Sequence, residues 1–569
     1  MTIFGWLEVI STLLLVVLAA WPLGAFMADV FEGRRTLLSP VLRPVECGFY
    51  RLAGIDETAE QEWLGYALSM ALFTALCFGA LYAILRLQHL LPLNPQGFPA
   101  VSPDLAFNIA ISFITNANWQ VYGGETTLST FSQMAGLTTQ NMLDSAVAIG
   151  IALALCRAFQ RHQSPTVGNF WVDVTRATLY VLLPLSCVVA LAFVALGSPQ
   201  TLQASIDVTT LEGAKQTIAL GPIASQEAIK LIGDNGGGYF SANSAHPFEN
   251  PNAWSNLLQN WSQLVLPVAL VFAFGRLIGD ARQGRALLIT MGILFAVGLV
   301  MIYGAETRPS PIFSALGVDV SAGNLEGKEL RFSQGASALF VQATTGTGTG
   351  ASNAVLESMT PIAGMAAMFN LMMGCLSPGG VGTGLYSLLL LALIAAFLSG
   401  LMVGRTPDFL GKKIAVREMR LALFALLVAP VLILGFSGAS VLLKTALDSL
   451  GASGPHGLSE IVYAYASSAA DNGSSFAGLN ANTPWFNVTT GVAMLLGRLA
   501  HAIPILAIAG SLAIKKKVPA SPGTLPTDGP LFVTFLLGVI LIVTLLQFFP
   551  VVALGPIVEH FFWLRGSGF

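Results

Sequence analysis

ATTGTGTG, residues 343–350, is the stretch from which the fold follows. It alternates threonine and glycine, carries no charge, and lies between a polar segment and a long apolar one. Glycine adopts positive φ without steric cost, so a run of this kind can turn successive carbonyl groups to one side. Four such strands around one axis can replace the water shell of a bare cation. A cation site of this kind needs four strands, so we expect three more in the chain.

Three other segments have a related composition. Residues 232–240 and 470–477 share an Asp-Asn-Gly core, and residues 114–120 form a weaker copy. Asn116 stands where the other strands place glycine, at Gly236, Gly350 and Gly473. Asparagine is among the few other residues that tolerate positive φ, so this exchange is physically permissible. The four segments lie roughly 115 to 125 residues apart, which indicates an internal repeat of long period.

The composition is that of a membrane protein. Only 10% of the 569 residues are charged and 54% are hydrophobic, whereas a soluble protein is about 25% charged. The net charge of -3 gives no reason to expect a nucleic-acid partner. Five cysteines lie far apart and match no metal or disulfide spacing, so we expect packing roles for them. The first apolar run, at about 3–30, lacks a cleavage site and is expected to be a retained helix.

Apolar runs long enough to cross about 30 Å of hydrocarbon predict the transmembrane helices. They lie at about 5–28, 65–87, 129–156, 172–196, 254–276, 284–303, 418–443, 486–513 and 530–550. A further region, 358–404, is too long for one span and is broken by the glycine-rich segment 374–384. A short half-polar helix is expected before each glycine-rich strand, at about 105–114, 222–232, 335–343 and 458–469.

The order of span, short helix, strand and span therefore occurs four times. We predict an all-α polytopic membrane protein with four fused helix–pore loop–helix repeats and one extra transmembrane helix at each end, about ten spans in all. The expected units are an N-terminal helix with a cytoplasmic loop (1–60), pore repeats at 61–165, 166–281, 282–412 (with an interrupted inner helix) and 413–518, and a C-terminal helix (519–569). Each short helix would point its negative C-terminal end toward the cavity, where a cation is favoured.

The distribution of basic residues predicts the orientation. If all four loops face outward, the inner segments hold 18 of the 27 basic residues, namely Arg34, Arg35, Arg43, Arg51, Arg157, Arg161, Arg176, Arg276, Arg282, Arg285, Arg405, Lys412, Lys413, Arg417, Arg420, Lys515, Lys516 and Lys517. The longer outer segments hold Arg86, Lys215, Lys230, Arg308, Lys328, Arg331, Lys444 and Arg565. The positive-inside rule then places the pore loops and both termini on the outer side.

Extended motifs around three of the strands give a resemblance to a known family. Residues 235–251, together with 115–120 and 471–482, closely resemble the potassium-translocating A subunit of the bacterial Kdp P-type ATPase complex. The resemblance covers the whole chain and implies a fold like four fused potassium-channel subunits, as in the Trk, Ktr and HKT transporters. It implies that K⁺ is the transported ion and that the protein lies in the bacterial plasma (inner) membrane, with its pore loops on the periplasmic side.

The resemblance also implies the site residues. The selectivity filter would comprise Thr115, Asn116, Ala117, Asn235, Gly236, Gly237, Thr349, Gly350, Asn472, Gly473 and Ser474. Potassium would bind at Asn116, Gly236, Gly350 and Gly473. Against the alternative that glycine-rich loops are ordinary turns, four of them stand at equivalent positions on one side.

Two further features have a functional and a purely structural interpretation. The segment with Gly374, Pro378, Gly379, Gly380 and Gly382 either connects two spans or forms a gating loop below the filter, as the superfamily resemblance implies. Arg498 lies within the span 486–513, where a cation is costly. It is either the pore's single positive charge, as the resemblance implies, or a structural arginine in an ion pair.

The sequence contains neither an Asp-Lys-Thr-Gly phosphorylation motif nor a complete Walker A motif, so we expect no nucleotide site and no catalysis by this chain alone. The resemblance implies a non-catalytic transport subunit that hands K⁺ to a P-type ATPase B subunit, in a complex with a C subunit and a small F subunit, surrounded by membrane lipid. The alternative is a self-sufficient Trk, Ktr or HKT type channel or symporter. Parallel repeats argue against a rocking carrier built from inverted repeats.

Overall fold

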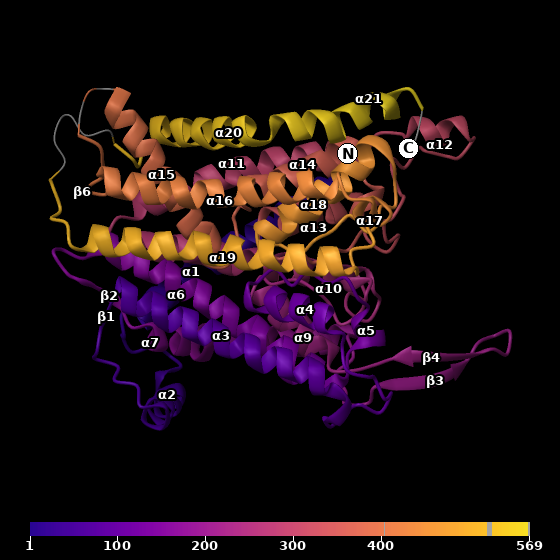
Figure 1. The fold of residues 1–569 in the computed structure, drawn as a ribbon, viewed down its shortest axis with the longest axis horizontal. Helices are drawn as coiled ribbons and strands as arrows, with labels where there is room; N and C mark the ends of the chain where they lie inside the picture. The colour runs from indigo at the N-terminus through magenta and orange to yellow at the C-terminus, as the bar shows by residue number, and fades with distance from the viewer. Residues whose placement is uncertain (403, 405, 520–525, 567–569) are drawn as a thin grey trace.

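The computed structural model describes residues 1–402, 404, 406–519 and 526–566. Arg405, one of the basic residues behind the predicted orientation, lies outside the described residues. Within the described ranges, ten helices are long and apolar enough to cross a membrane. This number agrees with the prediction, and the long helices run side by side along one direction (Figure 1).

The spans follow the predicted order along the chain. They are built on α1 (Ile3–Phe31), α3 (Trp63–Leu87), α6 (Thr139–Gln160), α7 (Phe170–Arg176) with α8 (Leu183–Leu196), α10 (Ala253–Leu277), α11 (Ala281–Glu306), α15 (Thr383–Met402), α16 (Val416–Ser440), α19 (Pro484–Ala513) and α20 (Pro530–Val552). Their exposed side chains are largely Leu, Ile, Val and Phe, which a lipid environment covers without cost.

A short helix precedes each glycine-rich strand, as predicted. The four are α4 (Pro103–Ile114), α9 (Ile223–Ile232), α13 (Gln334–Gly346) and α18 (Gly454–Ala469). Local signals explain where two of them begin. Pro103 occupies the first position of α4, where a missing N–H costs nothing, and the Ser333 hydroxyl accepts a hydrogen bond from Ala336 N to cap α13. Four helix–strand–helix units and two flanking helices thus confirm the predicted fold class.

The long apolar region 358–404 is one broken span. It consists of α14 (Pro361–Met372) and α15, separated by a loop in which Gly374, Gly379 and Gly382 have φ values of 82°, 86° and 84°. These left-handed conformations favour glycine and cannot continue a helix. The break in the sequence pattern therefore predicted the break in the helix.

Several smaller elements were not predicted. A β-hairpin joins α8 to α9, with β3 (Ser205–Thr209) antiparallel to β4 (Lys215–Ala219). The remaining short elements are α2 (Ser39–Ala53), β1 (Gln61–Glu62), β2 (Thr166–Gly168), α5 (Gly124–Thr127), α12 (Pro311–Ala315), β5 (Asp408–Phe409), β6 (Lys412–Lys413), α17 (Lys444–Leu447) and α21 (Val558–Leu564). The last of these extends the C-terminal helix beyond the predicted end after a kink at Gly555.

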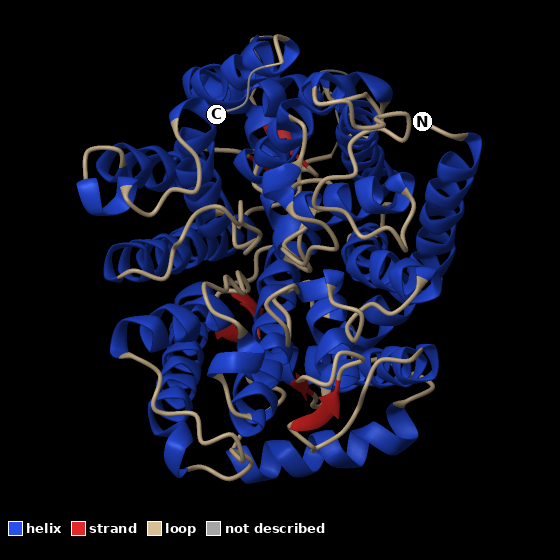
Figure 2. Cartoon of the chain, turned by 90° about the vertical axis from the view of Figure 1, so that its right-hand side faces the viewer, coloured by secondary structure: helices blue, strands red, loops and turns tan. Residues whose placement is uncertain are grey.

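The two ends of the helical body differ. The hairpin β3–β4, α5, α12, α21 and the N-terminus lie toward one end, whereas α2, β1 and β2 lie at the other (Figure 1). Seen from the hairpin end, loops gather near the centre and helices surround them (Figure 2).

The first helix packs closely against α10 of the second unit. A Cβ added at Gly24 of α1 would lie 2.5 Å from the Ala269 carbonyl oxygen and 2.7 Å from Phe272 Cβ. Small residues that let two backbones approach are a main source of helix association in membranes, where lipid removes the hydrophobic driving force. The extra N-terminal span is therefore held to the repeats by direct packing.

We predict that Gly24→Leu separates α1 from α10 and lowers the thermal unfolding temperature of the purified protein in detergent. The matched control is Gly79→Leu in α3, because a Cβ at Gly79 has no atom within 4 Å. Equal melting temperatures for the two variants would contradict the packing role of Gly24.

Candidate functional site

The four aligned positions share one backbone conformation. Asn116, Gly236, Gly350 and Gly473 have φ values of 71°, 76°, 71° and 90°; the first three are buried and Gly473 is half-buried. Each follows the C-terminal end of its short helix, at Ile114, Ile232, Gly346 and Ala469. The negative ends of four helix dipoles thus precede the four strands.

Three of the junctions between strands have no room for a side chain. A Cβ at Gly236 would collide with the carbonyl oxygen of Thr349 in the third strand. One at Gly350 would collide with the carbonyl oxygen of Asn472 in the fourth, and one at Gly473 with that of Ala117 in the first. The second strand therefore contacts the third, the third the fourth, and the fourth the first.

The junction between the first and second strands uses asparagine side chains instead. Asn116 Nδ2 donates to the Asp234 carbonyl oxygen at 2.8 Å, and Asn235 Nδ2 donates to Asn116 Oδ1. Asn118 Nδ2 also donates to the Gly236 carbonyl oxygen at 3.2 Å. This last contact closes the cycle, so the structure brings the four predicted strands together in a ring.

Other predicted filter residues form hydrogen bonds that hold the strands to one another or to the short helices. The Thr115 hydroxyl donates back to the Ile111 carbonyl of α4 at 2.9 Å. Asn472 Nδ2 donates to the carbonyl oxygens of Thr344 and Thr347, at 2.7 Å and 3.0 Å, which ties the third strand to the fourth. Ser474 Oγ lies 2.9 Å from the Tyr463 hydroxyl of α18.

Asp234 was not predicted as a site residue. Its Oδ2 accepts a hydrogen bond from Gly348 N at 3.2 Å, and its Oδ1 accepts one from the Thr349 hydroxyl. The carboxylate thus joins the second strand to the third. The signal was available in the shared Asp-Asn-Gly core, but the partner lies more than 100 residues away in the sequence.

The broken span places its loop against the ring. Ser377 N and Gly379 N both donate to the Gly346 carbonyl oxygen, at 2.9 Å each. A Cβ at Gly380 would lie 3.4 Å from Gly348 N, and one at Gly382 would collide with the Ala148 carbonyl oxygen of α6. The loop therefore packs on the third strand as well as joining two helices.

Arg498 is buried below the fourth strand and is not a free charge. Its Nη2 lies 3.1 Å from Asp144 Oδ2, and its Nη1 lies 3.6 Å from Asp471 Oδ2 and 3.4 Å from the Tyr386 hydroxyl. Pairing with two carboxylates offsets the cost of burying the guanidinium group. The carboxylate of Asp471, next to Asn472, links this cluster to the strand.

A cavity of about 100 Å³ adjoins this cluster. It is lined by Asp471 and by residues of α15, α16, α19 and α20, including Tyr386, Ala429, His501 and Thr544. Gly374 and Leu376 of the glycine-rich loop also face it. The cavity therefore lies between the base of the fourth strand and the helices at the outside of the bundle.

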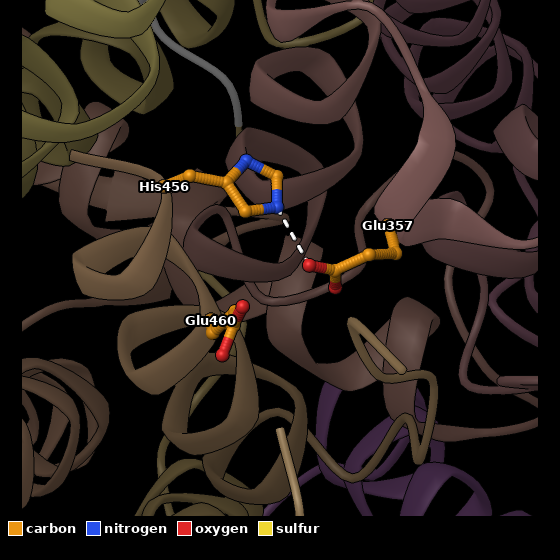
Figure 3. A group of neighbouring side chains, drawn as sticks. All are labelled: Glu357, His456 and Glu460. Atoms are coloured by element: carbon orange, nitrogen blue, oxygen red, sulfur yellow. Dashed lines mark hydrogen bonds and ion pairs between the residues drawn. The ribbon is translucent and has the colours of Figure 1, made fainter. Parts of the chain in front are cut away.

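One group of side chains in the described part of the chain has ligand atoms close enough to share a metal ion. Glu357, His456 and Glu460 lie within 4.8 Å of one another (Figure 3). Each ring nitrogen of His456 already contacts a carboxylate, Nε2 that of Glu357 at 2.7 Å and Nδ1 that of Glu559 at 2.8 Å. Both Glu460 oxygens accept backbone N–H groups. Together with Glu559, these residues form an ion-pair cluster, the His456 clamp. It joins α18 to α21 and to the segment after the third strand.

The protonation of the clamp depends on pH. Burial lowers the pKa of His456, but hydrogen bonds to Glu357 and Glu559 outweigh it and raise the pKa to about 10. Burial raises the pKa of Glu460 to about 7. A raised pKa stabilises the fold below the unfolded pKa, and this contribution disappears as the pH rises through the folded pKa. The stabilisation from His456 should therefore fade between pH 6.5 and about 10.

We predict that His456→Gln lowers the melting temperature at pH 7, because a lost hydrogen-bond partner costs about 1–3 kcal/mol. The variant should also show a smaller fall in melting temperature between pH 6.5 and 10 than the unmodified protein. His89→Gln, at an exposed histidine, is the control. An equal fall in melting temperature between pH 6.5 and 10 in His456→Gln and in the unmodified protein would contradict the stabilising role of His456.

Comparison with known proteins identifies a family and relatives that match almost the whole chain. The family model for the potassium-transporting ATPase A subunit matches residues 10–561. A potassium-transporting ATPase potassium-binding subunit from Allorhizobium ampelinum is 56% identical over 563 residues, covering 99% of each chain. One from Beijerinckia indica is 56% identical over 557 residues, covering 98% of each.

A solved structure has a similar fold. The potassium transporter TrkH from Vibrio parahaemolyticus has a TM-score of 0.50 to this chain with 16% sequence identity, covering 88% of this chain and 97% of that one. At this identity the likeness concerns the fold alone. The match over nearly the whole chain and the identity to full-length relatives show that the protein belongs to the potassium-transporting ATPase A subunit family.

Proposed function

We propose that this chain is the potassium-binding and translocating subunit of an ATP-driven K⁺ uptake pump. The observation that carries the proposal is the closed ring of four strands, each with a residue of positive φ. At three of the four junctions between neighbouring strands, no Cβ fits. Rings of backbone carbonyl groups replace the water shell of K⁺ in selective channels. Curated relatives carry the name potassium-binding subunit, which supports the choice of ion.

The proposed ion site is the backbone at Asn116, Gly236, Gly350 and Gly473. The flanking residues Thr115, Ala117, Asn235, Gly237, Thr349, Asn472 and Ser474 hold these positions in place. Buried polar side chains that fix their neighbours preorganise such a site. The cost of stripping water from the ion is then offset by groups that need little rearrangement.

Below the ring, we assign the loop with Gly374, Pro378, Gly379, Gly380 and Gly382 as a gate. Its hydrogen bonds to the Gly346 carbonyl oxygen support this role, because a movement of the loop would break these bonds and displace the third strand. Arg498 with Asp144 and Asp471 would form the charged floor of the pore. The cavity beside Asp471 is the proposed start of a lateral path for the ion toward a partner chain.

The energy for transport would come from another chain. This chain lacks a recognisable phosphorylation or nucleotide motif, so we assign it no catalysis and no bound nucleotide. We propose that it works with a P-type ATPase B subunit, a C subunit and a small F subunit in the bacterial inner membrane. In the proposed topology, the loops of the four pore repeats (61–165, 166–281, 282–412 and 413–518) lie on the periplasmic side. Both termini of the chain lie on the same side.

The proposal predicts K⁺-stimulated, vanadate-sensitive ATPase activity when this chain is purified together with its partner subunits. The activity should disappear when the chain is omitted from the complex. Sustained potassium uptake into proteoliposomes by this chain alone would instead favour a self-sufficient channel or symporter of the Trk type.

We predict that Gly350→Ala in the complex raises the K⁺ concentration for half-maximal ATPase activity by about tenfold or more, equivalent to at least 1.4 kcal/mol of lost binding. The added methyl group collides with the Asn472 carbonyl oxygen and strains a backbone with φ of 71°. Gly292→Ala in α11 is the control, since a Cβ there has no atom within 4 Å. An unchanged K⁺ dependence in a folded Gly350→Ala complex would refute the proposed ion site.

A further inference from the structure

Lys230 is a fully buried lysine directly behind the second strand. It lies in the last turn of α9, and its side chain is 1% exposed. Two carboxylates pair with its ammonium group, Glu227 at 2.8 Å and Glu249 at 2.8 Å, and they are equally buried. A buried ammonium group is stable only when paired and hydrogen-bonded in this way.

The third contact of the ammonium group is with the strand itself. Lys230 Nζ donates to the Gly237 carbonyl oxygen at 2.7 Å. Asn243 Nδ2 donates to the same oxygen at 2.5 Å, and Lys230 Nζ also lies 3.1 Å from Asn243 Oδ1. A carbonyl oxygen has two lone pairs, so both acceptor sites of Gly237 are used by donors from its own repeat.

Glu249 extends the same network along the chain. Its Oε2 accepts from Lys230, and its Oε1 accepts from Phe240 N at 2.8 Å. The second strand is therefore held at Gly237 and again at Phe240. Its neighbour Gly236 contacts the first and third strands, so this hold is passed directly to the ring.

The charged arrangement occurs in one quarter of the ring. Gly236 N donates to the Lys230 carbonyl oxygen, and Asn118 N and Gly350 N donate in the same way to Ser112 and Thr344, so the positions that correspond to Lys230 in the other repeats hold Ser112, Thr344 and Ser467. The Ser112 hydroxyl donates to the Trp119 carbonyl oxygen at 3.1 Å, so the first strand is held by an uncharged donor. Among the described residues, the Thr344 and Ser467 hydroxyl groups have no hydrogen-bond partner. A charged anchor for the strand is thus a property of the second repeat and not of the fold.

We propose that Lys230, held by Glu227 and Glu249, is a positioning residue that fixes the second strand through the Gly237 carbonyl and thereby sets ion affinity and selectivity. This inference rests on the proposed function. Gly237 then serves as the anchor of the strand, while Gly236 faces the ion. Selection between ions of equal charge depends on how firmly the coordinating oxygens are held, so loosening one quarter of the ring weakens discrimination.

The test compares Lys230→Met with Lys328→Met in the purified complex. Lys328 is a matched control because its side chain is only 5% exposed and is paired with Glu306, and within the described residues its ammonium group donates to no filter strand. The measurements are the K⁺ and Rb⁺ concentrations for half-maximal ATPase activity and the maximal rate. Lys230→Arg tests rescue by a side chain that keeps the charge and the donor.

For Lys230→Met we expect the half-saturating K⁺ concentration to rise about tenfold with a maximal rate within about twofold of the unmodified complex, and the preference for K⁺ over Rb⁺ to fall. Lys230→Arg should recover part of the affinity. If Lys230→Met fails to assemble, the variant Glu227→Gln/Lys230→Met/Glu249→Gln removes the unpaired charges and decides the question.

Two results would overturn the inference. The first is an assembled Lys230→Met or triple variant whose K⁺ and Rb⁺ dependence matches that of Lys328→Met. The second is failure of both variants to assemble, which would assign the triad to folding of the repeat. An unmodified complex without K⁺-stimulated activity would instead refute the proposed function itself, so the two failures are distinguishable.

Discussion

The close approach of one strand's α-carbon to the next strand's carbonyl oxygen is the constraint on which the structure depends. At Gly236, Gly350 and Gly473 a single methyl group would separate neighbouring strands. Irregular backbone at membrane depth survives only where protein buries it or a watery cavity faces it. The short helices, the surrounding spans and the buried polar side chains all keep these four strands together.

A single chain allows each quarter of this ring to differ. The first strand uses Asn116 where the others have glycine, and its amide bonds replace a backbone contact. The second is anchored by Lys230, the third packs on the glycine-rich loop, and the fourth adjoins Arg498. Four identical subunits would have to repeat every such feature, whereas a fused chain places each one once.

Three groups of paired charges lie inside the described part of the chain. The Glu227–Lys230–Glu249 group lies behind the second strand, the Arg498 cluster lies below the fourth, and the His456 clamp joins α18 to α21. Removing one partner from such a group leaves an uncompensated charge, which makes these positions sensitive to mutation. The Arg498 cluster and the His456 clamp join different repeats and so limit how these move relative to one another, whereas the Lys230 group acts within the second repeat.

The sequence alone determined the spans, the four short helices, the break between α14 and α15 and the four strands, because apolar run length and glycine patterns act locally. It also singled out the four positions that share positive φ, since few residues other than glycine and asparagine adopt it. Only the tertiary structure decided that Asp234 bonds to Thr349, that Arg498 is paired with Asp144, and that Lys230 holds Gly237. The first two contacts join residues more than 100 positions apart, and the third depends on how a helix end meets a strand. Such contacts arise from packing, which no local pattern of residues encodes.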